Sequence, residues 1–145
     1  MAGYYPPASF HFRVEFNLGE QENDIRFQEV SGINAELDVF SFKAGGENRF
    51  THEFPERAKY PDLVLKRGLL VDSTVVDWCR DAIEELDISP TNVLVHLLNE
   101  QHEPLQSYSF INAWPKKWEL SSFNAERSEF AIETIYLSYQ YFNIL

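Results

Sequence analysis

The stretch Phe10-His-Phe-Arg-Val-Glu-Phe-Asn-Leu18 alternates apolar and polar residues without interruption. Strict alternation with a period of two is typical of a β-strand that has one face in a core. Shorter alternating or apolar runs follow at residues 25–28, 63–68, 93–98, 105–114 and about 128–142. The chain is therefore expected to be mainly β.

Residues 33–54 predict a long hairpin. The first strand alternates polar residues with the apolar residues Ile33, Ala35, Leu37 and Val39. At Phe40 and Phe42 the apolar side chains change to the other face of the strand. Gly45-Gly46 supplies the positive φ angles of a tight turn, after which residues 48–54 return as the partner strand. Such a hairpin has apolar residues on both faces, so it requires a second surface to cover it. We expect a loop between Pro55 and Pro61.

One segment, about residues 73–86, has helical periodicity. Its apolar stripe consists of Val75, Val76, Cys79, Ala82, Ile83 and Leu86, and its other side is acidic. Thr74 stands three residues before Asp77, which is the spacing of a capping box, and Pro90 follows the end of the helix. Several strands and one helix predict an antiparallel β-sandwich or barrel capped by that helix.

Length and composition limit the classes of protein. The 145 residues, 44% of them hydrophobic, fit a single domain over 1–145, with residues 1–8 as an N-terminal arm. The single cysteine excludes an intramolecular disulfide and indicates assembly in a reducing cytoplasm. No apolar run approaches the roughly 20 residues of a membrane span, and the start lacks the features of a secretory signal. The net charge of -11 disfavours sequence-specific binding of nucleic acid.

No group of residues predicts catalysis, a metal site or a cofactor. His11, His52, His96 and His102 fall in four different segments without metal-ligand spacing. Cys79 lies on the apolar helix stripe and lacks a catalytic signature. Gly45-Gly46 precedes neither a helix nor a Lys-Ser/Thr pair, so it indicates a turn and not a phosphate-binding loop.

The segment Trp114-Pro-Lys-Lys-Trp118 is the one basic and aromatic cluster. Two flanking tryptophans with lysines between them permit a stacking platform for nucleic acid. They equally permit packing beneath a bent strand or a subunit contact, where large aromatic residues concentrate binding energy, and we favour this interpretation. Pro115 lacks a backbone donor, so the strand is expected to bend or to lie at an edge.

Several short motifs occur in a fixed order along the chain. They are Phe27-Gln-Glu-Val-Ser-Gly32, Gly45-Gly46-Glu-Asn48, Tyr60 followed by Leu65-Lys-Arg-Gly68, Trp78, Asn112-Ala-Trp-Pro-Lys-Lys-Trp118, Asn124 and Phe130-Ala-Ile-Glu-Thr-Ile135. In this order the chain resembles, over roughly residues 10–142, the tail-tube protein family of contractile phages, tailocins and extracellular contractile injection systems. The ending Leu137-Ser-Tyr-Gln-Tyr-Phe142 departs from the His-Glu-Gly type ending of many relatives, which leaves the subfamily open.

The resemblance implies a structural subunit without enzymatic activity. Six copies would form a ring, and rings would stack into a hollow tube inside a contractile sheath for the passage of DNA or protein cargo. The implied partners are the protein itself, the sheath, a baseplate or hub and a cap or terminator. Assembly would occur in the bacterial cytoplasm, within a phage tail or a tail-like particle released outside the cell.

Candidate interface and lumen residues come from the hairpin and the tryptophan cluster. We expect subunit or ring contacts at Phe40, Phe42, Gly45, Gly46, Asn48, Phe50, Trp114 and Trp118. Glu36 and Asp38 are candidates for the lumen wall, where like charge would keep acidic cargo from adsorbing.

Three further functions are compatible with the sequence. Two belong to the same superfamily: the ring protein of a type VI secretion system, and a tube-initiating paralogue that joins the tube to the baseplate. The third is a monomeric barrel that binds a small apolar ligand, which the aromatic content permits.

Overall fold

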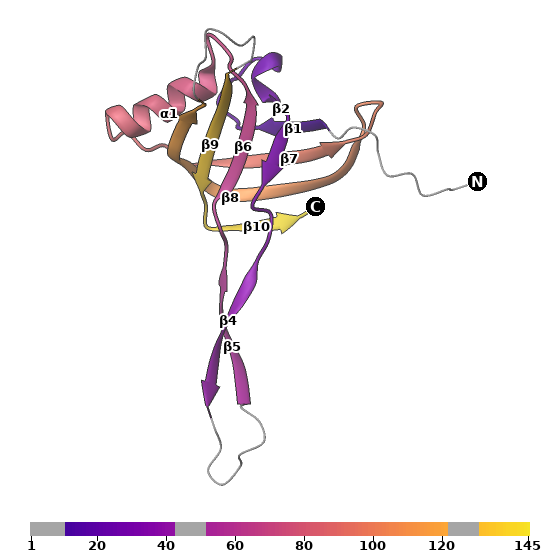
Figure 1. Cartoon of the computed structure of the whole chain (residues 1–145), viewed down its shortest axis with the longest axis vertical. Coiled ribbons are helices and arrows are strands. Elements are labelled where there is room, and N and C mark those ends of the chain that lie inside the picture. Colours follow the sequence, from indigo (N-terminus) through magenta and orange to yellow (C-terminus); the bar gives the residue numbers. More distant parts are fainter. Residues whose placement is uncertain (1–10, 43–51, 122–130) are drawn as a thin grey trace, which may run out of the picture.

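The computed structural model describes residues 11–42, 52–121 and 131–145. Figure 1 shows a body of strands with one helix on its flank and a long hairpin that projects away from the body. The prediction of a mainly β, antiparallel fold with one α-helix is confirmed.

Twelve elements follow one another along the described residues. In chain order they are β1 (His11–Glu15), η1 (Glu22–Ile25), β2 (Arg26–Phe27), β3 (Glu29–Ser31), β4 (Glu36–Phe42), β5 (His52–Lys59), β6 (Leu63–Gly68), α1 (Thr74–Glu84), β7 (Thr91–Leu98), β8 (Pro104–Leu120), β9 (Ile132–Ser138) and β10 (Tyr141–Ile144). β1 ends earlier than the alternation predicts because the Glu20 carboxylate accepts hydrogen bonds from the backbone of Phe16 and Leu18, each at 2.8 Å.

The body is one eight-stranded sheet in the order β2-β1-β7-β8-β9-β6-β3, with β10 paired to β8. All of these pairs are antiparallel. The alternating residues of the strands meet inside the curled sheet and exclude water. Its fully buried members include Val14, Phe16, Leu63, Leu65, Val93, Phe110, Ile135 and Leu137.

The 17-residue strand β8 serves both halves of this sheet. Its first part pairs with β7 and β10, and its last part, from Trp114 onward, pairs with β9. The partner strand therefore changes just before Pro115. The prediction that the strand bends or lies at an edge near Pro115 is confirmed: among the described strands, β8 is paired from Trp114 onward on one side only, with β9, and the register shifts between Pro115 and Lys117.

The helix α1 packs against β8 and begins close to the expected position, but it ends at Glu84, two residues before Leu86. Its N-cap is Ser73 and not Thr74, because the Ser73 hydroxyl accepts the hydrogen bond from the Val76 amide at 3.0 Å. The buried stripe contains Val75, Trp78, Cys79 and Ala82. It thus includes Trp78, which the predicted stripe lacked, and it leaves out Ile83 and Leu86. Those two residues are exposed.

The hairpin consists of β4 and β5, which form a two-stranded sheet of their own. At its root Gly32 has a φ of +91°, and a Cβ at this position would meet the backbone carbonyl of Asp62. This close approach explains the bend at Gly32. The predicted loop after Pro55 was wrong: β5 runs through Pro55 to Lys59, beside a register shift between Leu37 and Val39.

Candidate assembly surfaces

The hairpin carries an aromatic face. Phe40 and Phe54 are directly opposite each other in the register, as are Phe42 and His52, so the four side chains share one side of the two-stranded sheet. The rings of Phe42 and Phe54 stack in parallel, with centroids 5.5 Å apart. Phe40 is 54% exposed and Phe54 is 51% exposed. We call this group of residues 40, 42, 52 and 54 the aromatic face.

The opposite side of the hairpin is also apolar. Leu37 pairs with Ala58 and Val39 pairs with Pro55, and Leu37, Val39, Pro55 and Ala58 are not buried. The register shift between Leu37 and Val39 inserts one extra residue in β5, and this keeps Pro55 and Ala58 on the same side. An apolar sheet with both faces in water is unfavourable for an isolated protein, so this hairpin has the properties of an interaction surface.

Charged residues lie at the root of the hairpin. Lys59 Nζ is 2.9 Å from Asp38 Oδ1, and Glu36 is the register partner of Lys59. The hydrogen bond and the charge of Asp38, with a smaller contribution from Glu36, raise the pKa of Lys59. The two expected lumen residues therefore lie close together, and one of them is already neutralised by an ion pair.

The structure places two of the other expected interface residues, the tryptophans of β8, away from the hairpin. Trp114 and Trp118 are half-buried in β8, within the body. Trp118 packs against the core and donates its indole N–H to Glu133 Oε1 at 2.7 Å. Gly45, Gly46, Asn48 and Phe50 lie outside the described residues.

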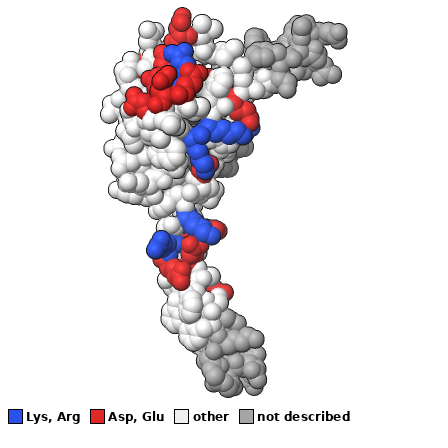
Figure 2. All heavy atoms as spheres, turned by 90° about the vertical axis from the view of Figure 1, so that its left-hand side faces the viewer, with Lys and Arg blue, Asp and Glu red and all other residues white. Residues whose placement is uncertain are grey.

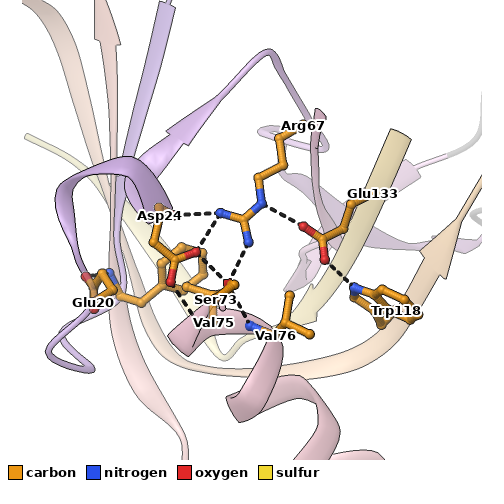
Figure 3. Close-up of polar contacts among 9 residues, drawn as sticks. Glu20, Asp24, Arg67, Ser73, Val75, Val76, Trp118 and Glu133 are labelled. Atoms are coloured by element: carbon orange, nitrogen blue, oxygen red, sulfur yellow. Dashed lines mark hydrogen bonds and ion pairs between the residues drawn. The ribbon is translucent and has the colours of Figure 1, made fainter. Parts of the chain in front are cut away.

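A buried ionic network, which was not predicted from the sequence, holds the body together (Figure 3). Arg67, which is 3% exposed, contacts Asp24 Oδ1 and Glu133 Oε2, each at 2.7 Å. The same guanidinium donates to the backbone carbonyl of Asp24 at 2.7 Å and to the Ser73 hydroxyl at 2.9 Å. The second carboxylate oxygen of Asp24 accepts the Val75 amide at 3.1 Å. The network thus ties η1, β6, β9 and the N-terminus of α1 into one unit.

The alternation of inward and outward side chains in β6 and β9 could have predicted this network from the sequence. Arg67 has the inward parity of Leu63 and Leu65, and Glu133 has the inward parity of Ile135 and Leu137. A cation and an anion at buried positions of two strands require one another, since an isolated buried charge is very unfavourable. The pairing of β6 with β9 follows from the same reasoning.

Cys79 lies on the buried face of α1, and its environment suppresses its reactivity. Burial, and then the charge of Glu133, raise the pKa of the thiol to about 12. The thiolate, which is the nucleophile, is therefore almost absent at neutral pH. Because an unperturbed cysteine has a pKa of about 8.5, we expect a thiol reagent at pH 8 to label the native protein at least about a hundredfold more slowly than the urea-unfolded chain. Equal labelling rates would show that α1 opens freely.

The described residues contain neither a metal-binding group nor a membrane-spanning helix. None of their His, Cys, Asp and Glu side chains form a group of three or more that could hold a metal ion. Within the same residues, no helix has the length and apolar character needed to cross a membrane.

A curled β body with a projecting hairpin that is apolar on both faces is typical of a structural protein. The chain belongs to the T4-like virus tail tube protein gp19 family, whose model matches residues 8–143. This is a family of structural tube proteins, and it accounts for the resemblance noted in the sequence.

Solved structures support the assignment. A chain in the structure of the anti-feeding prophage baseplate is 28% identical, with a TM-score of 0.84, and the match covers 100% of this chain and 97% of that one. A chain in the structure of the tube-terminating cap of the anti-feeding prophage is 26% identical, with a TM-score of 0.78 and coverage of 100% and 94%. A chain in the extended sheath-tube complex of the PVC extracellular contractile injection system has the same fold at 21% identity, with a TM-score of 0.74 and coverage of 97% and 90%. None of the curated proteins matches the sequence.

Proposed function

We propose that this protein is the subunit of the inner tube of a contractile tail or injection system. Six copies close into a ring, and rings stack into a conduit for DNA or protein cargo. The observation that carries the proposal is the two-faced apolar hairpin in a chain of the tail tube family. A second copy that covers the hairpin removes its apolar residues from water.

The charge of the chain limits how rings contact one another. A ring of six copies multiplies the net charge of -11 sixfold, so acidic side chains face the lumen or solvent rather than the stacking contacts. Glu36 and Asp38 remain our candidates for the lumen wall. Since Asp38 is paired with Lys59, Glu36 would contribute most of the local negative potential.

The proposed partners follow from the assemblies that contain similar chains. These assemblies are a baseplate, a cap and a sheath-tube complex. By analogy, the tube would contact a sheath along its length, a baseplate or hub at one end and a cap at the other. Assembly would take place in the bacterial cytoplasm.

A second candidate function is a tube-initiating paralogue at the baseplate. The observation that favours it is the 28% identity to a chain in a baseplate structure. Co-purification with baseplate proteins in the absence of sheath would support this role, and a stoichiometry of many copies per particle would support the main tube.

The type VI ring protein and the ligand-binding barrel have less support. A type VI secretion system protein shares only the fold, at 11% identity and a TM-score of 0.67. For a ligand-binding barrel, the interior is filled by core side chains and leaves no room for a ligand among the described core residues.

Electron microscopy of the purified protein tests the proposal. Negative-stain images over a range of concentrations are expected to show six-fold rings or tubes, and analytical ultracentrifugation should give the matching mass. A monomer that persists at high concentration would overturn the proposal.

A further inference from the structure

A pocket lies where the start of β1 meets β2 and the turn between β7 and β8. Its volume is about 410 Å³, and its floor includes Phe12 and Leu98. Arg13, Arg26 and two histidines contribute to the lining, and among the described residues Glu22 is the only acidic side chain that lines it. We call this pocket, lined by His11, Arg13, Arg26 and His102, the basic pocket.

The two arginines of the basic pocket are incompletely satisfied within the protomer. Among the described residues, Arg13 Nε has no hydrogen-bond partner, and its distance to Glu15 Oε1 is 3.4 Å. Arg26 is 3.4 Å from Glu22 through an exposed contact, which contributes little. The imidazole rings of His11 and His102 are 5.2 Å apart. In a chain with 12 Lys and Arg against 23 Asp and Glu, this concentration of basic groups favours an anionic partner.

The C-terminal end of α1 has the complementary character. Glu84, Glu85 and Asp87 surround Leu86, which is 81% exposed and has a φ of +54°. The amides of Glu85 and Asp87 both donate to the Asp81 carbonyl, each at 3.1 Å, so the turn that presents Leu86 is well defined. Ile88, which follows this turn, is 47% exposed. We call residues 84–88 the acidic tip.

The two surfaces lie on opposite sides of the body. In Figure 1 α1 is at the left, and the start of β1 with the β7–β8 turn is at the right. Figure 2, which faces the α1 side, shows acidic side chains gathered over the upper part of this surface. Complementary patches on opposite sides of one subunit give head-to-tail contacts, which close into rings when the rotation between copies permits.

We propose that the acidic tip of one copy docks in the basic pocket of the next copy, with Leu86 against the apolar floor and the carboxylates against Arg13 and Arg26. This inference rests on the proposed function, because the partner is a second copy of this chain. It adds a directional contact to the apolar contacts of the hairpin.

Charge reversal with mixing tests the contact. One variant is Arg26→Glu, and the other combines Glu84→Lys with Glu85→Lys. Both sites are exposed, and lysines at a helix C-terminus are favourable, so both variants should fold. Each variant alone should need at least about a tenfold higher concentration for ring formation, since like charges then face each other. A mixture of the two should recover rings, because alternating copies restore opposite charges at every contact.

The control variant Lys66→Glu makes the same charge change outside the pocket and should assemble as the wild type does. Rings that form normally from both charge-reversal variants would overturn the inference while leaving the proposed function intact. Weakened assembly without recovery on mixing would also overturn it, because the partner of the pocket would then be a surface other than the acidic tip. Failure of the wild type to form rings would instead contradict the proposed function.

Discussion

The double variant Phe40→Ser and Phe54→Ser is expected to stay monomeric at concentrations where the wild-type protein forms rings. These two side chains face each other across the hairpin, and each is about half exposed in the single chain. Burying a phenylalanine against a partner contributes about 1.5–3 kcal/mol, and each 1.4 kcal/mol changes an equilibrium constant about tenfold. Loss of two such contacts should therefore weaken each association step at least about a hundredfold.

Sedimentation velocity over a concentration series measures this shift, and circular dichroism should show an unchanged fold. A matched control is Val71→Ser with Leu105→Ser, which removes two exposed apolar side chains outside the hairpin. The control is expected to assemble more readily than the hairpin variant. Assembly of the hairpin variant at wild-type concentrations would contradict the role of the aromatic face.

Replacing Arg67 with methionine should lower the free energy of unfolding by about 3–5 kcal/mol, the usual cost of removing one partner from a buried ion pair. Asp24 is 2% exposed and Glu133 is fully buried, so both carboxylates would lose their cation in a place that water does not reach. The cation–π contact of Arg67 with the Phe27 ring, at 4.7 Å, would also disappear. A loss of this size is a large part of the roughly 5–15 kcal/mol by which most domains are stable.

Urea denaturation of the Arg67→Met protein measures this loss directly. Arg26→Met is the matched control, because Arg26 is exposed and surface substitutions usually change stability by less than about 0.5 kcal/mol. A loss below about 1 kcal/mol for Arg67→Met would show that the two carboxylates find other partners or become protonated.

The alternation of side chains was sufficient to predict most of the body. β1 and β9 were predicted from sequence because their apolar residues recur with the period of a strand, β6 and β7 because they are short apolar runs, and α1 because its stripe has helical period. The hairpin was predicted because its apolar residues fall on both faces of the expected strands. Phe40 and Phe42, which change the apolar face, are exposed in the structure and do not belong to the core.

One proline misled the prediction for a physical reason. Pro55 was expected to begin a loop, but it lies inside β5, opposite the register shift between Leu37 and Val39. Such a shift depends on the partner strand, which local sequence does not reveal. The contact of Arg67 with Asp24 joins residues 43 positions apart, and it too depends on the folded topology.

The shared strand β8 has a consequence for local opening. Because one continuous main chain is hydrogen-bonded to β7 in one half of the sheet and to β9 in the other, neither half can open without disturbing the other. The body should therefore exchange its amide hydrogens as a single slow unit. Among the described strands β4 and β5 pair only with each other, so their amides should exchange faster in the free subunit. Protection of those amides on assembly would report the moment at which a neighbour covers the hairpin.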